Sequence, residues 1–212
     1  IKNLEKKELK ESVVVIGAGG AGLVAAIEAK LNGAEKVVVL EKMAFAGGNT
    51  LISGGEYAAP NNWVQEKQGI KDSPDTFYND ILKGGDNEGN PKLVRVLADN
   101  ALKDAEWLRD FIGMEFEDRQ LFFGGHSVER SLVPKDATGV EMIKKLLAKA
   151  DELGIEIYYE TPATELVMEN DRVVGVKAQS STTDYTFLAD KGVIIASGGF
   201  GSNVEMRMKY NL

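Results

Sequence analysis

Apolar residues near the start of the chain follow the pattern of a β-strand, an α-helix and a second β-strand. Val13 to Ile16 form an uninterrupted apolar run, which is typical of a strand that is buried on both faces. An alanine-rich segment from about Gly20 to Leu31 predicts a helix, and Lys36 to Leu40 predicts another apolar strand that runs into Glu41. A helix between two buried strands indicates a βαβ unit, so we expect an α/β fold with a parallel sheet.

The pattern returns to strands after Ile155. Four short runs have the character of strands, IEIYYE, TELVME, RVVGVKAQ and YTFLAD, and Glu169-Asn170-Asp171 predicts a hairpin turn between the second and the third. A final apolar strand, Val193 to Ala196, leads into a small-residue turn that starts at Ser197. We expect this strand in the same parallel sheet as the first two, because ligands of open α/β sheets bind at the carboxyl edge where such strands end.

Two helices in the middle of the chain are predicted to begin at side-chain caps. Ser73 precedes one helix and Asn90 the other, and each is followed by a proline in the first helical position. The second helix extends to about Phe111, the segment from Met114 to Ala137 is irregular, and a further helix runs from about Thr138 to Leu153. The apolar positions of the second helix recur at helical spacing and are predicted to face the core: Leu93, Val96, Leu97, Ala101, Leu102, Ala105, Trp107 and Leu108.

The turn after the first strand has the G-x-G-x-x-G spacing of dinucleotide-binding sites. Gly17 allows a tight turn, Gly19 lets the backbone approach a pyrophosphate, and Gly22 lets the helix pack closely on the strand. The free N–H groups and the dipole at the start of the helix favour the negative charge of a pyrophosphate. Glu41 is placed to accept hydrogen bonds from a ribose diol and would repel a 2′-phosphate, which disfavours NADP. The other residues of the turn are small: Ala18, Gly20 and Ala21.

A second glycine-rich segment, Lys42 to Pro60, follows the βαβ unit. One interpretation is a second cradle for a ligand, because glycines allow close approach and Asn49, Thr50 and Ser53 offer short polar side chains. The other is a plain surface loop with a helix cap at Asn49 or Thr50. The residues alone do not favour either interpretation.

Composition and charge exclude several classes of function. The 212 residues carry a formal net charge of −8, which argues against nucleic acid or an anionic membrane as partner. With no cysteine and one histidine, the chain lacks the side chains for a typical metal site or a cysteine nucleophile. No apolar run approaches the roughly 20 residues of a membrane span. The absence of cysteine leaves the compartment open.

The ends of the sequence suggest a larger context. Residues 1–11 are charged with mixed sign, and we expect a linker from a possible upstream domain, followed by one domain over 12–212. The first residue is not methionine, so a segment can precede it.

Four segments together resemble a known family. The segments VVVIGAGGAGL, LEKMAFAGGNTLISGG, GGHSVERSLVP and GVIIASGGFGSNVEMRMKY occur in the order and spacing of the fumarate reductase and succinate dehydrogenase flavoproteins. The likeness is greatest to the soluble flavocytochrome c type fumarate reductases and urocanate reductases, and it extends from Ser12 to Leu212. It implies a glutathione-reductase-like FAD-binding Rossmann domain with a parallel sheet and an added β-hairpin region.

The resemblance also implies which residues hold FAD, without a covalent bond. Gly17 to Gly22 would hold the pyrophosphate and Glu41 the adenosine ribose. Lys42 and the second glycine loop would line the phosphates and the flavin, the main chain around Ala163 would contact the adenine end, and the last strand would reach the pyrophosphate. The residues implied beyond the first turn and Glu41 are Lys42, Gly48, Asn49, Thr50, Ser53, Gly54, Gly55, Ala163, Thr164, Ala196, Ser197 and Gly198.

The chemistry implied by the resemblance is reduction of a carbon–carbon double bond conjugated to a carboxylate, with a hydride from the flavin and a proton from an acidic side chain. In relatives that acid and an arginine follow the segment matched here, so we expect them beyond Leu212. His126, Ser127 and Arg130 are candidates near the substrate, because the family places their loop near the flavin. Lys135-Asp136-Ala137 replaces an arginine- and glycine-rich run of relatives, which puts a dicarboxylate substrate in question.

Several alternatives stay open from the sequence. The chain can be a flavin-binding fragment or assembly module that is inactive without its missing half, or an NAD-linked Rossmann dehydrogenase. The NAD-linked alternative predicts neither a second glycine cradle nor a terminal Ser-Gly-Gly strand. A haem or FMN domain upstream, the electron donor and the compartment are not specified by these residues.

Overall fold

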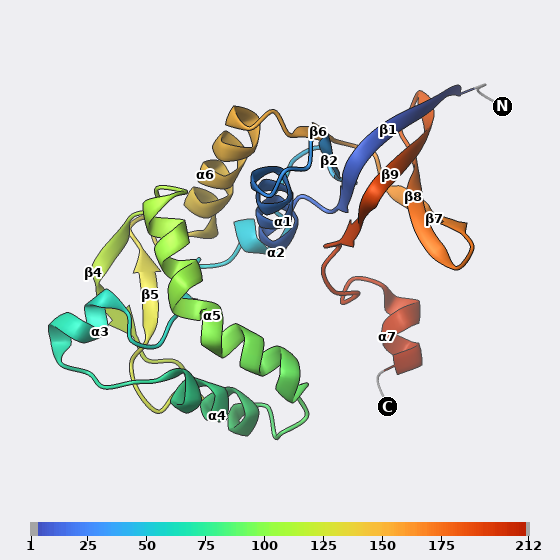
Figure 1. The fold of residues 1–212 in the computed structure, drawn as a ribbon. Coiled ribbons are helices and arrows are strands. Elements are labelled where there is room, and N and C mark those ends of the chain that lie inside the picture. Colours follow the sequence, from blue (N-terminus) through green and yellow to red (C-terminus); the bar gives the residue numbers. More distant parts are fainter. Residues whose placement is uncertain (1–3, 211–212) are drawn as a thin grey trace. The chain divides into compact units, whose positions relative to one another are not determined.

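The structure is a computed structural model that describes residues 4–210. The chain divides into two compact units, and most of their elements are labelled in Figure 1. The first comprises the residues up to 51 and from 146 onward, and the second comprises residues 52–145. Each unit has its own β-sheet.

The first unit contains a six-stranded sheet formed by β1 (Glu5–Ile16), β2 (Val37–Leu40), β6 (Glu156–Tyr158), β7 (Ala163–Glu169), β8 (Arg172–Gln179) and β9 (Thr183–Ile195). The order across the sheet is β6-β2-β1-β9-β8-β7. The first four of these strands pair in parallel, and β9, β8 and β7 continue as an antiparallel meander. Helix α1 (Gly20–Leu31) connects β1 to β2. The predicted α/β fold with a parallel sheet and an added hairpin region is confirmed.

Both faces of the central strands are buried. Val14 and Val38 lie in a cluster that also contains Val176 of β8 and Phe187 of β9, each at most 3% exposed. Because side chains alternate along a strand, Val15, which is also buried, lies on the opposite face. Strands with two covered faces need apolar side chains at every position, which explains the uninterrupted valine runs.

Strand β1 is longer than the sequence pattern indicates. The sequence predicts a linker over residues 1–11, but residues 5–11 pair in parallel with residues 183–189 of β9, and Figure 1 shows the two strands side by side. Main-chain pairing with β9 stabilises this charged segment, and Leu9 packs against the core cluster. The register shifts between Glu11 and Val13, as at a β-bulge. β9 is also one continuous strand where the sequence suggests two. Residues 1–3 lie outside the described residues.

The predicted hairpin turn between β7 and β8 is confirmed. Glu169 pairs with Arg172, so the loop contains only Asn170 and Asp171. Both loop residues have positive φ, 47° and 62°. Two central residues with positive φ are the mark of a type I′ turn, whose twist matches that of the two strands.

The second unit contains a three-stranded antiparallel sheet in the order β3-β5-β4. The segment expected to be irregular includes two of its strands, so that expectation is wrong. The alternation of apolar and polar residues that marks a strand is not visible in this part of the sequence. The register shifts between Phe116 and Gln120, and β5 is buried on both faces. The strands are β3 (Tyr57–Ala58), β4 (Phe116–Leu121) and β5 (Ser131–Pro134), and the helices of this part are α3 (Trp63–Gln68), α4 (Pro74–Gly84) and α5 (Pro91–Asp110).

The caps of α4 and α5 are confirmed, but the buried face of α5 differs from the predicted one. Ser73 Oγ accepts from Thr76 N at 3.0 Å, and Asn90 Oδ1 accepts from Lys92 N at 3.0 Å. Leu93, Val96 and Leu97 are 68%, 61% and 53% exposed. The first half of α5 lacks a neighbour on that side within its unit, whereas small alanines let the second half pack closely. The buried residues are Ala98, Ala101, Ala105 and Leu108, and Leu102 and Trp107 are half-buried.

The remaining helices are short or lie at the junctions of the chain. Helix α2 (Gly48–Leu51) lies within the second glycine segment, α6 (Gly139–Glu152) includes residues of both units, and α7 (Val204–Tyr210) ends the described chain. In the part of the chain that the structure describes, none of the helices has the length and apolar character to cross a membrane.

Candidate functional site

The glycine turn between β1 and α1 leaves no space for side chains at two positions. A Cβ atom on Gly22 would lie 1.8 Å from the carbonyl oxygen of Gly17, and one on Gly17 would lie 2.4 Å from that of Ala196. Gly17 also has a φ of +105°, which residues with side chains rarely adopt. At Gly19, by contrast, the nearest atom to a Cβ would be the oxygen of Gly47 at 3.7 Å. The turn packs tightly against neighbouring backbone at Gly17 and Gly22, and it has free space at Gly19, as the spacing predicts.

Helix α1 begins without a side-chain cap from its own sequence. Its N-cap residue is Gly19, and the helix has no acidic residue in its first turn. The N–H group of Gly20 donates to Thr50 Oγ1 at 3.3 Å. The start of an α-helix leaves N–H groups without intrahelical partners and carries a partial positive charge. The residues present therefore fit a pyrophosphate, which would accept hydrogen bonds and supply negative charge.

The second glycine segment lies directly against this turn. Gly47 N donates to Ala18 O at 2.8 Å, and Gly47 forms a parallel bridge with Gly19. Gly48 and Asn49 follow at the surface, at the start of α2. Thr50 lies inside α2 and accepts from the start of α1, so it does not cap a helix of its own. The second glycine segment thus continues the surface of the glycine turn, and its role as a ligand cradle stays a prediction.

The carboxylate of Glu41 is buried and oriented by the main chain. The residue is 8% exposed, and its Oε2 accepts from Ala18 N at 2.9 Å while Oε1 accepts from Met43 N at 2.8 Å. An ionised carboxylate offers about four acceptor positions, so two main-chain bonds leave capacity for two ribose hydroxyls. The side chain joins the end of β2 to the glycine turn, as the predicted ribose contact requires. Lys42, the next residue, is exposed.

The end of β9 reaches the same turn. Ala196 N donates to Ile16 O at 2.8 Å, which places the start of the Ser-Gly-Gly segment beside Gly17. Ser197 and Gly198 are exposed, and a Cβ on Gly198 would meet no atom within 4 Å. On β7 of the same sheet, Ala163 packs against the core cluster and Thr164 is exposed. The contacts of these residues with a cofactor remain a prediction.

Ser53, Gly54 and Gly55 belong to the second unit, where they form a tight turn. Gly55 N donates to Ser53 Oγ at 3.2 Å, and Ser53 O accepts from Gly139 N at 2.8 Å. Gly55 has a φ of +75°, and a Cβ there would lie 2.9 Å from Thr138 O. The structure thus gives these residues a local packing role at the start of α6. Their predicted role at the flavin stays a prediction.

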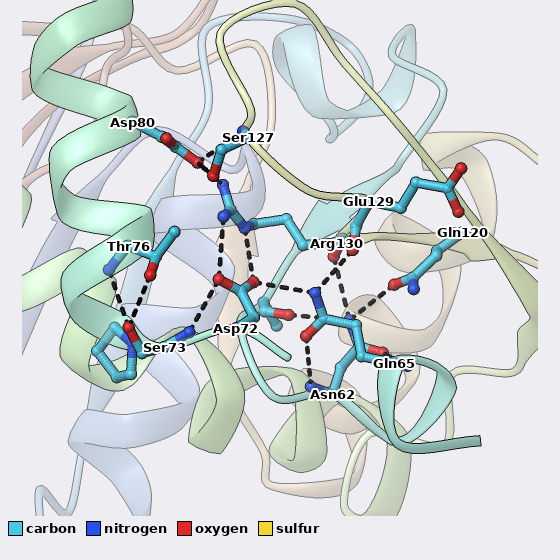
Figure 2. Close-up of polar contacts among 12 residues, drawn as sticks. Asn62, Gln65, Asp72, Ser73, Thr76, Asp80, Gln120, Ser127, Glu129 and Arg130 are labelled. Carbon is cyan, nitrogen blue, oxygen red and sulfur yellow. Dashed lines mark hydrogen bonds and ion pairs between the residues drawn. The ribbon is translucent and has the colours of Figure 1, made fainter. Parts of the chain in front are cut away.

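Arg130 has protein carboxylates as partners. Its side chain is fully buried, with Nε and Nη2 bonded to Asp72 at 2.8 and 3.0 Å and Nη1 bonded to Asp80 Oδ2 at 2.6 Å. Ser127 donates from its N–H and its hydroxyl to the same Asp80 oxygen, each at 2.9 Å. Figure 2 shows these groups converging from α4, the loop before α4 and the loop before β5. Arg130, a candidate for a place near the substrate, thus has its carboxylate partners within the protein.

The charges of this network stabilise one another. Burial by itself raises the pKa of Asp72, but hydrogen bonds from Arg130, Gln65 and the Ser73 main chain outweigh it and lower the pKa below its ordinary value. For Asp80, burial likewise opposes hydrogen bonds from Ser127 and Arg130, and the pKa is again lowered. Both carboxyl groups are therefore ionised at neutral pH and hold the guanidinium between them.

Sequence reasoning missed most of this network. Asp72 and Asp80 lie 58 and 50 positions from Arg130, so no local pattern connects them. One signal was available, because Asn62 and Gln65 have the spacing of a capping box, and they form one at the start of α3. Asn62 Nδ2 also donates to Gln120 Oε1 at 3.0 Å, and Gln65 Nε2 donates to Asp72 Oδ2 at 2.9 Å and to Glu129 O at 2.7 Å.

Together, the glycine turn, the uncapped helix and the acid at the end of β2 define a dinucleotide-binding α/β domain of the Rossmann type. The second glycine segment and the end of β9, both in contact with the turn, are the features that an NAD-linked alternative does not predict. Residues 12–211 match the family described as FAD binding domain, and the chain belongs to that family. It is an FAD-binding domain of the kind found in flavoprotein reductases.

The relatives support the family resemblance seen in the sequence. The chain is 47% identical over 202 residues to a urocanate reductase of Eggerthella lenta and 38% identical over 200 residues to an NADH:fumarate oxidoreductase of Klebsiella pneumoniae. These alignments cover 94% and 93% of the chain. An open conformation of a flavocytochrome c3 fumarate reductase matches 95% of the chain with a TM-score of 0.90 and 34% identity.

The chain spans only part of each of these proteins. It covers 33% of the urocanate reductase, 21% of the NADH:fumarate oxidoreductase and 36% of the flavocytochrome chain. The comparison therefore establishes the FAD-binding domain, and the activity of the whole relatives belongs to proteins that are several times longer.

Proposed function

We propose that this FAD-binding domain serves a reductase of the carbon–carbon double bond in an α,β-unsaturated carboxylate. The observation that carries the proposal is the convergence of three main-chain segments, at Gly17, Gly47 and Ala196, around the start of α1 and the buried carboxylate of Glu41. An extended dinucleotide needs such a composite cradle, and the family match identifies it as FAD.

Different residues hold different parts of the cofactor. The N–H groups at the start of α1 bind the pyrophosphate, Glu41 accepts from the adenosine ribose, and Gly19, Gly48 and Asn49 leave the approach open. FAD supplies two-electron reduction when bound. We propose non-covalent binding; this sequence has no cysteine for a thioether link, and the acid precipitation described below tests for a link through its single histidine.

A urocanate-like or fumarate-like acid is the proposed substrate class. Both the urocanate reductase and the fumarate-reducing relatives bear names of unsaturated carboxylic acids. The 47% identity to the urocanate reductase and the Lys135-Asp136-Ala137 departure support urocanate as the first acid to test.

The test has two stages. The purified chain is titrated with FAD, and binding is followed by quenching of flavin fluorescence; acid precipitation should then release all flavin into solution. The FAD-loaded protein is next mixed with reduced methyl viologen and urocanate or fumarate. Failure to bind FAD would overturn the proposal. A reductase predicts acid-dependent oxidation of the dye.

A second candidate function is flavin binding without turnover until another segment or partner is supplied. The coverage of only 33% of the urocanate reductase favours this alternative. It predicts FAD binding with no oxidation of the dye by either acid. The two candidates are separated by the second stage of the same experiment.

A further inference from the structure

Three parallel strands of the first unit end next to one another along one edge of its sheet. Their order is β6-β2-β1, and both pairs are parallel, so their carboxyl ends share that edge (the strands are labelled in Figure 1). β1 ends at the glycine turn, β2 ends before Glu41, and β6 ends before Tyr159. With the pyrophosphate at the first of these ends and the ribose at the second, the path of an extended adenosine leads to the third.

The register between β2 and β6 puts Tyr159 opposite Glu41. Leu40 is paired with Tyr158, so the next position along both strands joins Glu41 and Tyr159. Leu40 and Tyr158 both lie in or against the same core cluster. Because side chains alternate along a strand, the following pair belongs to the other face.

The turn after β6 is fastened to Glu41 from both sides. Glu41 N donates to Tyr158 O at 2.8 Å, and Glu41 O accepts from Thr161 N at 2.9 Å. Glu160 N donates to Met43 O at 3.0 Å, and Glu160 has a φ of +47°, which turns the chain sharply at this point. The main chain of Tyr159 is therefore held beside the carboxylate that is proposed to bind the ribose.

The ring of Tyr159 is not used by the core. The neighbouring Tyr158 ring packs edge-on against Tyr185 and Phe187, with centroids 5.5 and 5.0 Å away. Tyr159 lies outside this aromatic cluster and is 38% exposed. Burial, and then the negative charge of Glu41, raise the pKa of the Tyr159 hydroxyl. The side chain is thus a neutral phenol on the Glu41 side of the turn.

Thr161 fixes both sides of this arrangement. Its residue is 2% exposed, and its Oγ1 donates to Tyr159 O at 2.7 Å while its N–H group donates to Glu41 O. One buried residue therefore sets the spacing between the main chains of Tyr159 and Glu41.

We propose that the ring of Tyr159 packs against the adenine base of bound FAD, and that Thr161 is the positioning residue that holds Tyr159 at the ribose-binding Glu41. The inference rests on the proposed function, which puts the adenosine ribose at Glu41. In adenosine the base is joined to the carbon next to one that carries a diol hydroxyl, so it lies within reach of groups that surround Glu41. Aromatic side chains stack on nucleic-acid bases, and a tyrosine with an apolar ring and a polar tip suits a partly exposed site.

Substitutions of Tyr159 test the contact through FAD affinity, measured by flavin fluorescence. Tyr159→Phe keeps the ring and should bind FAD within about twofold of the parent chain, whereas Tyr159→Ser should bind it roughly five- to 150-fold more weakly. The control is Met168→Ser on β7 of the same sheet, which removes a side chain that is 52% exposed and should leave FAD affinity unchanged. Parental FAD affinity in Tyr159→Ser would overturn the proposal.

ADP locates the contact on the adenosine half, because it lacks the flavin. Its affinity is measured by displacement of FAD, and Tyr159→Ser should weaken ADP and FAD by similar factors. In a chain labelled with ¹³C in the tyrosine rings, the signal missing from Tyr159→Phe belongs to Tyr159, and ADP should shift it. Equal ADP affinity in the parent and Tyr159→Ser, or a Tyr159 signal that does not respond to ADP, would overturn the contact with adenine.

Thr161 variants separate positioning from folding. Thr161→Val loses the hydroxyl and should weaken FAD binding by about two- to tenfold, and Thr161→Ser should restore the parental affinity. Urea unfolding of the FAD-free proteins is the second measurement. A loss of stability in Tyr159→Ser as large as its loss of binding free energy would contradict the adenine contact and assign the ring to folding. Failure of the parent chain to bind FAD would contradict the proposed function itself, whereas normal binding by the parent and by all variants contradicts only the roles of Tyr159 and Thr161.

Discussion

The hydroxyl oxygen of Thr50 lies 3.3 Å from the main-chain nitrogen of Gly20, so a residue of the second glycine segment accepts the first N–H group of α1. The two glycine segments are thereby parts of one site although 30 positions separate these residues. This contact leaves the following N–H groups of the first turn as the ones that a phosphate can use. It also explains why small residues recur in both segments, because a Cβ on Gly20 would lie 2.8 Å from Thr50 Oγ1.

Gly22→Ala should abolish FAD binding and destabilise the first unit by about 1–3 kcal/mol, the usual cost of overpacking. The added methyl group would lie 1.8 Å from Gly17 O, so the glycine turn has to open. Gly201→Ala is the control, since a Cβ there meets no atom within 4 Å. FAD titration and urea unfolding measure both effects. A Gly22→Ala protein with parental FAD affinity would contradict the close packing of α1 on the turn.

Glu41→Ala should weaken FAD binding and lower the free energy of unfolding by about 1–3 kcal/mol, because the buried N–H of Ala18 loses its acceptor. Glu41→Gln keeps one side-chain oxygen and should have an intermediate effect on both quantities. Exposed Glu56→Ala serves as a control. Fluorescence quenching gives the affinity and urea unfolding gives the stability. Unchanged FAD affinity in Glu41→Ala would show that Glu41 does not contact the ribose.

Arg130→Met should destabilise the protein by about 3–5 kcal/mol, because Asp72 and Asp80 are left without their buried cation. Lys67→Met breaks an ion pair whose side chains are 61% and 81% exposed and should cost less than about 1 kcal/mol. Both variants are compared by urea unfolding at neutral pH. Similar losses in the two proteins would show that the Arg130 network contributes no more than a surface pair.

Acid should unfold the protein in a way that depends on Asp72 and Asp80. The pKa of each is lowered in the folded state, so their stabilisation is complete above the unfolded value of about 3.9 and is lost as the pH falls through the folded value. Asp80→Asn should therefore flatten the dependence of unfolding free energy on pH below about pH 4. Asp75→Asn on the same helix is the control, because that carboxylate is 82% exposed in its ion pair with Arg95. Parallel curves for the two variants would contradict this assignment.

His126 adds a separate step at higher pH. Its folded pKa is lowered, so neutral His126 stabilises the protein fully above the unfolded value of about 6.5, and this contribution declines as the pH falls. Spectra of the protein labelled with ¹⁵N only in histidine report this titration directly, because the sequence has a single histidine. Arg130, Asp80 and Asp72 are the charged groups that influence it. A histidine titrating above about pH 6.5 would contradict the buried, uncharged ring.

The βαβ unit could be predicted from local sequence, because its hydrophobic pattern and its glycine and acidic residues indicate the same structure. The run from Val13, the helix from Gly20 to Leu31 and the acid at Glu41 are all where the pattern places them. The hairpin at Asn170 and the caps at Ser73 and Asn90 were also predictable, because each depends on residues that are adjacent in sequence.

The rest depended on partners distant in sequence. Residues 5–11 form a strand only because β9 pairs with them, and the exposed apolar side chains of Leu93, Val96 and Leu97 have no partner within their unit. The sequence makes Arg130 a candidate near the substrate through the position of its loop in the family, and nothing in that loop indicates Asp72 or Asp80 as its partners. Helical periodicity identifies an apolar face, but it cannot say whether that face is covered.

The pairing of residues 5–11 with β9 affects how the domain can be cut for experiments. Family similarity starts at residue 12, but a protein that begins there would leave the first half of β9 with an open edge over residues 183–189. Unpaired strand edges recruit strands from other molecules, so the shortened protein should self-associate and aggregate. The charged opening segment thus covers a strand edge that the family match alone would leave out of a shortened protein.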